Sequence, residues 1–271
     1  MSRLEQCFEE LKAANKKALV PFVTAGDPSA KFTLTCMHEM VKAGANIIEL
    51  GVPFSDPMAD GPVIQKASER ALEAGMSLKG VIEIVRLFRE TDQSTPVILM
   101  GYLNPIEFMG YETFADKAAQ AGVDGVLTVD IPPEESADLL KAYDKHDIAP
   151  IFLLSPTSNE TRIKKIAAVA KGYIYYVSLK GVTGAGHLEL NDVQTKLTQI
   201  KQHTSLPVVI GFGVKNAEIA ANIAKIGDGV VVGSALINCI THHSDDEEQA
   251  QQAISTMLSE MRTAMDATTQ Q

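Results

Sequence analysis

The feature that most constrains the fold is a regular alternation of short apolar runs with segments of helical character. Eight runs rich in β-branched residues occur at 18–23, 46–51, 96–101, 125–130, 149–154, 173–178, 207–212 and 229–234. Every gap between them contains loop residues and then apolar residues at helical spacing. Strands that are apolar on both faces and alternate with helices pair in parallel through right-handed crossovers. Eight such units in 271 residues favour a closed (β/α)8 TIM barrel over the alternative, an open doubly wound sheet.

Two helices are expected in addition to the repeating units. The gap between the second and third runs is the longest and contains two helical stretches, at 62–75 and 78–90. A charged amphipathic segment at 1–17 precedes the first run, and one plausible use for it is to plug the floor of the barrel. No low-complexity linker divides the chain, and 242–249 has the composition of a solvated loop and helix start. We therefore expect residues 1–271 to form a single barrel domain.

Composition excludes several classes of function. The net charge of −10 argues against a nucleic-acid or anionic-membrane partner, because either needs a basic face. No apolar run approaches the ~20 residues that span a bilayer, and the N-terminus does not resemble a signal peptide. The three cysteines, Cys7, Cys36 and Cys239, have no CxxC spacing, and the six histidines form no metal-ligand pattern. We expect a cytoplasmic protein without a metal site or a disulfide framework.

Glu49 is the first candidate for chemistry, because it interrupts an apolar strand. If Ile48 and Leu50 pack on the helices, the two-residue period of a strand directs Glu49 into the mouth of the barrel. Barrel enzymes place their reactive groups at that end of the strands. A desolvated carboxylate has a raised pKa and can act as an acid or base. The alternative is a structural glutamate paired with a lysine or satisfied by backbone amides.

Asp60 is the second candidate and lies in the loop VPFSDPMADGP that follows the same strand. Because Gly61 and Pro62 open a helical segment, the simpler role for Asp60 is helix capping. Three prolines restrict this loop, which suits a segment that presents side chains in a defined arrangement. Asp56, a third carboxylate in the loop, is interpreted as a surface or interface residue.

Glycine-rich loops after the last three strands predict a phosphate site. In SLKGVTGAGH, at 178–187, Gly181, Gly184 and Gly186 allow backbone N–H groups to converge on an anion. The motifs GFGV at 211–214 and GSAL at 233–236 follow strands seven and eight, where barrels often bind phosphate. Tight turns alone would also explain such glycines.

Lys180 offers a competing chemistry, because a lysine beyond the sixth strand can form a Schiff base with a carbonyl substrate. An exposed loop position explains it equally well, and the same applies to His187 as a phosphate contact. Four strand residues are candidates for an apolar pocket, although ordinary core packing accounts for each: Phe22, Leu127, Tyr175 and Phe212.

The stretch ELGVPFSDPMADG at 49–61 closely resembles the signature of the tryptophan synthase alpha chain family. The resemblance continues through PFVTAGDP at 21–28, GVDGVLTVDIPPEES at 122–136, GVTGA at 181–185 and PVVIGFGV at 207–214. It implies a (β/α)8 barrel that cleaves indole-3-glycerol phosphate to indole and glyceraldehyde 3-phosphate. This retro-aldol step needs no cofactor in this chain.

The resemblance also implies roles for individual residues. Glu49 would be the acid/base at the reacting carbon and hydroxyl, Asp60 would stabilise charge at the indole N–H, and Tyr175 would assist. The indole ring and the phosphate would be held by Phe22, Leu127, Thr183, Gly184, Phe212, Gly213, Val232, Gly233 and Ser234. The sequence departs from the family pattern at Leu179-Lys180 and Gly186-His187, and Met100 and Val232 replace other aliphatic pocket residues.

A partner is implied as well: a beta chain carrying pyridoxal phosphate (PLP), assembled as α2β2, that receives indole through an internal tunnel. Loop 53–60 and the segment 104–108 would lie at that interface. Two alternatives remain open at this stage. One is a Schiff-base aldolase of another sugar phosphate that uses Lys180, and the other is a barrel that only binds or activates a beta chain.

Overall fold

The computed structural model describes residues 1–177, 187–211 and 213–268. Its eight strands form one closed barrel in sequence order, and every neighbouring pair is parallel, including β8 with β1. The strands are β1 (Ala18–Thr24), β2 (Ile48–Gly51), β3 (Val97–Gly101), β4 (Gly125–Thr128), β5 (Ala149–Leu154), β6 (Ile174–Val177), β7 (Val208–Gly211) and β8 (Gly229–Val232). The predicted TIM barrel is confirmed.

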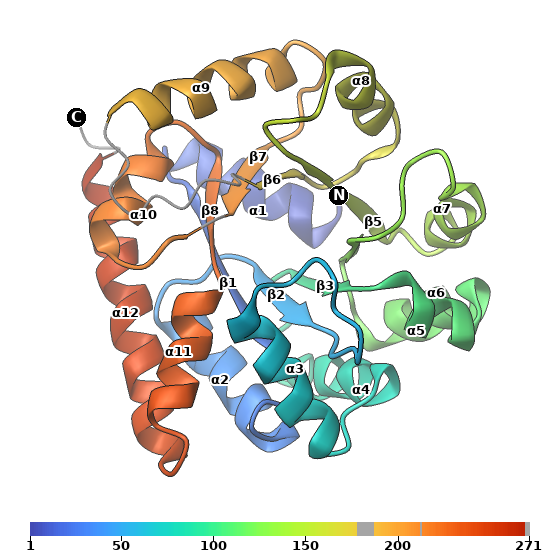
Figure 1. The fold of residues 1–271 in the computed structure, drawn as a ribbon, viewed down its shortest axis with the longest axis vertical. Helices are drawn as coiled ribbons and strands as arrows, with labels where there is room; N and C mark the ends of the chain where they lie inside the picture. Colours follow the sequence, from blue (N-terminus) through green and yellow to red (C-terminus); the bar gives the residue numbers. More distant parts are fainter. Residues whose placement is uncertain (178–186, 212, 269–271) are drawn as a thin grey trace.

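Helices surround the strands on all sides in Figure 1. Those of the described residues are α1 (Arg3–Ala13), α2 (Ala30–Lys42), α3 (Pro62–Glu73), α4 (Leu78–Phe88), α5 (Leu103–Met109), α6 (Tyr111–Ala121), α7 (Ala137–Asp144), α8 (Glu160–Val169), α9 (His187–Lys201), α10 (Ala217–Ala224), α11 (Ser234–His242) and α12 (Glu247–Thr268). The β2–β3 connection holds both α3 and α4, as the sequence predicted. The short α5 in the β3–β4 connection is a further addition.

The core has two shells, which follow from the alternation of side chains along each strand. The outer shell lies between strands and helices and includes Ile48 and Leu50. The inner shell fills the barrel and includes Val20, Ile47 and Ile98. Burial of both faces explains why the strands appear as continuous apolar runs in the sequence.

Helix α1 closes the N-terminal end of the barrel. Its Leu4 and Leu11 are buried in the inner shell, and its Phe8 ring lies 6.0 Å from the ring of Tyr173. In Figure 1 the helix lies behind the strands. Arg3 of α1 forms an ion pair of 2.9 Å with the buried carboxylate of Asp124. The amphipathic N-terminal segment therefore plugs the barrel floor, and the site must lie at the opposite end.

Within the described residues, no helix has both the length and the apolar character that crossing a bilayer requires.

Candidate functional site

Glu49 points into the barrel and is completely buried. Its neighbours Ile48 and Leu50 belong to the outer shell, so the predicted inward orientation is confirmed. The Tyr173 hydroxyl donates a 2.6 Å hydrogen bond to Glu49 Oε1. Glu49 Oε2 has no hydrogen-bond partner among the described residues. The carboxylate is thus held by a tyrosine and not, within this part of the chain, by a lysine or by backbone amides.

Burial raises the pKa of Glu49 from 4.5 to about 7, and the hydrogen bond from Tyr173 only partly opposes this effect. Removal from water penalises the charged form, while donation from a hydroxyl stabilises it. Near neutral pH both protonation states of Glu49 are therefore populated. A group in this condition can accept a proton and return it during one reaction.

Asp60 stands at the end of the loop that joins β2 to α3, and it does not cap the helix. The N-cap of α3 is Gly61, and no side chain makes a capping hydrogen bond there. The Asp60 carboxylate instead accepts a 2.9 Å hydrogen bond from the Tyr102 hydroxyl. Burial raises the pKa of Asp60, and the bond from Tyr102 partly lowers it. The capping interpretation is wrong, because the tertiary contact with Tyr102, the residue after β3, determines where this side chain lies.

Asp56 lies on the surface of the same loop, as predicted. Its carboxylate is exposed and accepts a 2.6 Å hydrogen bond from the neighbouring Ser55 hydroxyl.

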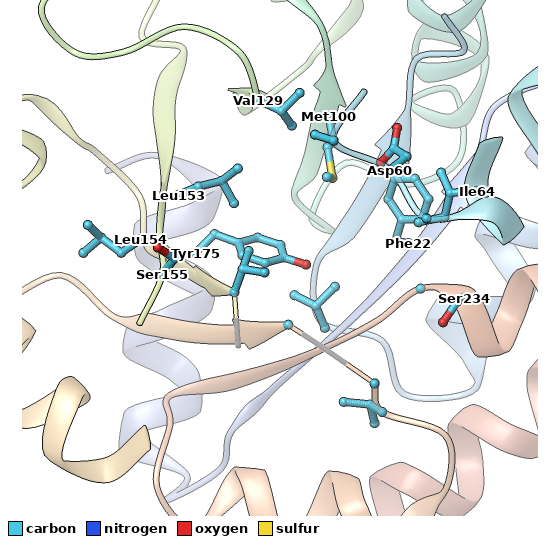
Figure 2. A pocket seen from close by; sticks show the side chains of 18 of the residues that line it. Phe22, Asp60, Ile64, Met100, Val129, Leu153, Leu154, Ser155, Tyr175 and Ser234 are labelled. Carbon is cyan, nitrogen blue, oxygen red and sulfur yellow. The ribbon is translucent and has the colours of Figure 1, made fainter. Parts of the chain in front are cut away.

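A cavity of about 1010 Å³ opens among the loops that follow the strands. Its lining includes predicted site residues from five separate segments: Phe22, Asp60, Tyr175, Gly213, Gly233 and Ser234. Figure 2 shows the Tyr175 hydroxyl directed into the cavity and Asp60 above the Phe22 ring. Ile64, Met100, Val129 and Leu153 supply apolar surface. The cavity suits a ligand with an apolar part and a few polar groups.

Glu49 lies below this cavity and is not part of its lining. It is paired in register with Phe22, which does line the cavity. Tyr173, its hydrogen-bond partner, precedes Tyr175 by two residues and belongs to the inner shell beside α1. The Glu49 carboxylate is therefore turned toward the barrel floor in this structure, and not into the mouth of the barrel as the sequence predicted.

One end of the cavity is suited to an anion. Gly233 is the N-cap of α11 and makes no side-chain cap bond. No capping side chain therefore competes for the first N–H groups of this helix. Gly213, which follows the neighbouring strand β7, has a φ of 61°, a conformation that favours glycine. Free backbone N–H groups and the positive end of a helix dipole attract phosphate.

Two predicted binding residues are placed differently from expectation. Val232 is fully buried in the outer shell, and Val231 lines the cavity in its place. Leu127 is buried in the inner shell, while Val129, two residues along the same strand direction, lines the cavity. The Val232 prediction fails because a shift of one residue along a strand moves a side chain to the opposite face.

Thr183, Gly184 and Phe212 lie outside the described residues, as do Lys180 and the other glycines of the 178–186 segment. The side chain of His187 is likewise not described.

Sequence reasoning missed two tyrosines that hold the carboxylates, Tyr173 and Tyr102. Tyr173 shares its strand face with Tyr175, so the two-residue period was a usable signal. Tyr102 directly follows β3, at the C-terminal end of the barrel strands. No local motif marks its contact with Asp60, which is 42 residues away.

Within the described residues, no three His, Cys, Asp or Glu side chains are grouped so that they could hold a metal ion.

Comparisons with known proteins agree with this geometry. The family model described as tryptophan synthase alpha chain matches residues 8–266. The tryptophan synthase alpha chain of Thioalkalivibrio sulfidiphilus is 59% identical over 98% of this chain and 100% of its own length. That of Methylococcus capsulatus is 57% identical, again over 98% of this chain and 100% of its own length.

Solved structures give the same result. The crystal structure of tryptophan synthase subunit alpha from Legionella pneumophila has a TM-score of 0.92 and 47% identity, covering 98% of this chain and 99% of that one. A crystal structure of tryptophan synthase from M. tuberculosis, in an aminoacrylate-bound form, has a TM-score of 0.87 and 30% identity. The match covers 98% of this chain and 100% of that one. The chain belongs to the tryptophan synthase alpha chain family.

Proposed function

We propose that Glu49 and Asp60 carry the lyase reaction of this family, the cleavage of indole-3-glycerol phosphate to indole and glyceraldehyde 3-phosphate. The observation that supports this most directly is the buried Glu49, whose pKa of about 7 suits reversible proton transfer. A second carboxylate, Asp60, lines the cavity directly above it. Two carboxylates in different environments can divide acid and base roles between them.

The chemistry requires three events. The indole C3 gains a proton, the indole N–H is stabilised as positive charge develops on the ring, and the C3′ hydroxyl loses a proton so that the carbon–carbon bond breaks. Glu49 exchanges protons at the carbon and at the hydroxyl, after its side chain rotates from Tyr173 toward the cavity. Asp60 accepts the indole N–H, and the Tyr175 hydroxyl assists at the reacting end.

Binding of the distant phosphate helps to align the reacting end of the substrate. We assign the phosphate to Gly213, Gly233 and Ser234, which line the cavity beside the N-terminus of α11. Gly184 belongs to the proposed phosphate set by its motif, and Thr183 and Phe212 to the indole set. Among the described residues, those assigned to the apolar wall around the indole are Phe22, Val129 and Val231.

The proposal includes a partner. Two of the large exposed apolar side chains are Met58, 81% exposed, and Phe108, 93% exposed. They lie in loop 53–60 and in α5, the two segments assigned to the partner interface. Exposed aromatic and methionine side chains are typical of protein interfaces. We infer an α2β2 assembly in the cytoplasm, in which a beta chain carries PLP and receives indole from this chain.

The test compares the wild-type chain with Glu49→Gln and, as a matched control, Glu83→Gln, an exposed glutamate on α4. Each purified chain is incubated with indole-3-glycerol phosphate, with and without a beta chain, and glyceraldehyde 3-phosphate release is followed. Loss of an acid/base should reduce the rate of Glu49→Gln at least ~100-fold, while Glu83→Gln keeps the wild-type rate.

The alternatives give other results. A Schiff-base aldolase would form a covalent adduct at Lys180 with a sugar-phosphate substrate under borohydride. A non-catalytic activator would release no glyceraldehyde 3-phosphate even with its beta chain.

A further inference from the structure

Tyr102 occupies a distinctive position between the two segments that border Asp60. It follows β3, is the residue before α5, and is only 3% exposed. Its ring stacks on Phe54 of loop 53–60, with centroids 5.2 Å apart and an interplanar angle of 29°. The aromatic contact fixes the ring, so its hydroxyl has a defined location beside the end of the loop.

The hydroxyl makes two hydrogen bonds to adjacent loop residues. The Ala59 backbone N–H donates to the Tyr102 hydroxyl oxygen at 3.0 Å. Because a phenol has a single proton and this bond uses a lone pair, the proton remains for Asp60 Oδ2, at 2.9 Å. The direction of both bonds is therefore determined: Tyr102 donates to Asp60, and this bond favours the ionised form of the carboxyl group.

Little else holds this carboxylate. Among the described residues, Tyr102 is the sole donor to the Asp60 side chain and no lysine or arginine pairs with it. The other titratable groups near this pair are Asp130, which accepts from the Leu103 N–H, and the buried Tyr175 and Glu49. None of these supplies a positive charge, so an ionised Asp60 depends on the Tyr102 hydroxyl.

We propose that Tyr102 is a positioning residue for the reaction: it orients Asp60 and keeps it charged to receive the indole N–H. This inference rests on the proposed role of Asp60. Because Tyr102 donates to Oδ2, Oδ1 is the oxygen left to accept from the indole N–H. The charge-assisted hydrogen bond is also the stronger kind, which favours a single carboxylate orientation.

The experiment is a double-mutant cycle between Tyr102→Phe and Asp60→Ala, assayed with indole-3-glycerol phosphate in the presence of a beta chain. Tyr102→Phe keeps the ring on Phe54 and removes only the hydroxyl. We expect its kcat to fall about 10-fold to 100-fold with KM changed less than about 2-fold, the range for losing a hydrogen bond to a charged group. In the Asp60→Ala background the same change should have almost no further effect.

Tyr143→Phe is the matched control. Tyr143 is also a buried tyrosine in an aromatic pair, with Phe114, but it belongs to α7 and does not line the cavity. Its kcat should equal that of the wild type. Thermal unfolding of each variant separates loss of fold from loss of positioning.

The outcomes separate the two proposals. If Asp60→Ala is inactive while Tyr102→Phe keeps full kcat, or if the two effects multiply, the positioning role is overturned and the proposed function stands. If Asp60→Ala turns over at the wild-type rate, both are overturned.

Discussion

At the scale of single residues, the burial of Glu49 imposes a cost on stability that depends on pH. Its pKa in the folded protein is about 7, against 4.5 for the exposed group. The folded state therefore binds this proton more tightly, and stability is lost as the pH rises from about 4.5 through 7. We expect Glu49→Gln to exceed the wild type by up to ~3 kcal/mol in free energy of unfolding at pH 8.5. The difference should shrink toward zero near pH 4.5.

Urea unfolding of both proteins at several pH values measures this difference directly. Glu83→Gln, which changes an exposed glutamate, should show no such pH-dependent gain. A Glu49→Gln protein that is equally stable or less stable at pH 8.5 would contradict the burial argument.

At the scale of elements, an ion pair ties α3 to the loop after β1. Arg70 of α3 donates two hydrogen bonds of 2.7 Å to the carboxylate of Asp27, whose side chain is 0% exposed. Because only the N-cap Gly61 separates Asp60 from α3, this pair also fixes the helix to which the loop with Asp60 is joined. Arg70→Ala leaves a buried carboxylate unpaired and should destabilise the protein by about 3 kcal/mol in urea unfolding.

Arg86→Ala is the control at the same scale, because the Arg86 side chain is 48% exposed and pairs with Glu83 and Glu90, two exposed glutamates of its own segment. It should leave the unfolding midpoint unchanged, since exposed ion pairs contribute little. If the two substitutions lowered the free energy of unfolding equally, the buried Arg70–Asp27 pair would contribute no more to stability than an exposed ion pair.

At the scale of the whole molecule, exposed apolar side chains border the loop that carries Asp60. Phe108 is 93% exposed on α5, a helix that the barrel itself does not require. We expect Phe108→Ser to weaken binding to a beta chain about 10-fold or more, as for an aromatic residue at an interface. The unfolding of the isolated chain should not change. Isothermal titration of the beta chain measures the affinity.

Glu9→Ser provides the comparison, because Glu9 is exposed on α1 at the barrel floor. Its affinity for the beta chain should equal that of the wild type. Unchanged affinity of Phe108→Ser would place the interface elsewhere.

The sequence by itself determined the architecture of this protein and the position of its principal carboxylate. Eight apolar runs alternating with helical segments predicted the barrel, because both signals arise from local periodicity. The pattern Ile48-Glu49-Leu50 was enough to direct Glu49 inward, since its two neighbours are apolar. The helix before β1 and the second helix before β3 were predicted for the same reason.

Only the tertiary structure decided how the site is held and which residues line it. In the run GVVVGS three valines stand in a row, so periodicity does not distinguish Val231 from Val232, and barrel closure sets which one faces the cavity. Tyr173 meets Glu49 across 124 residues, and Tyr102 meets Asp60 across 42. Such contacts depend on strand register and barrel closure, which no local pattern in the sequence specifies.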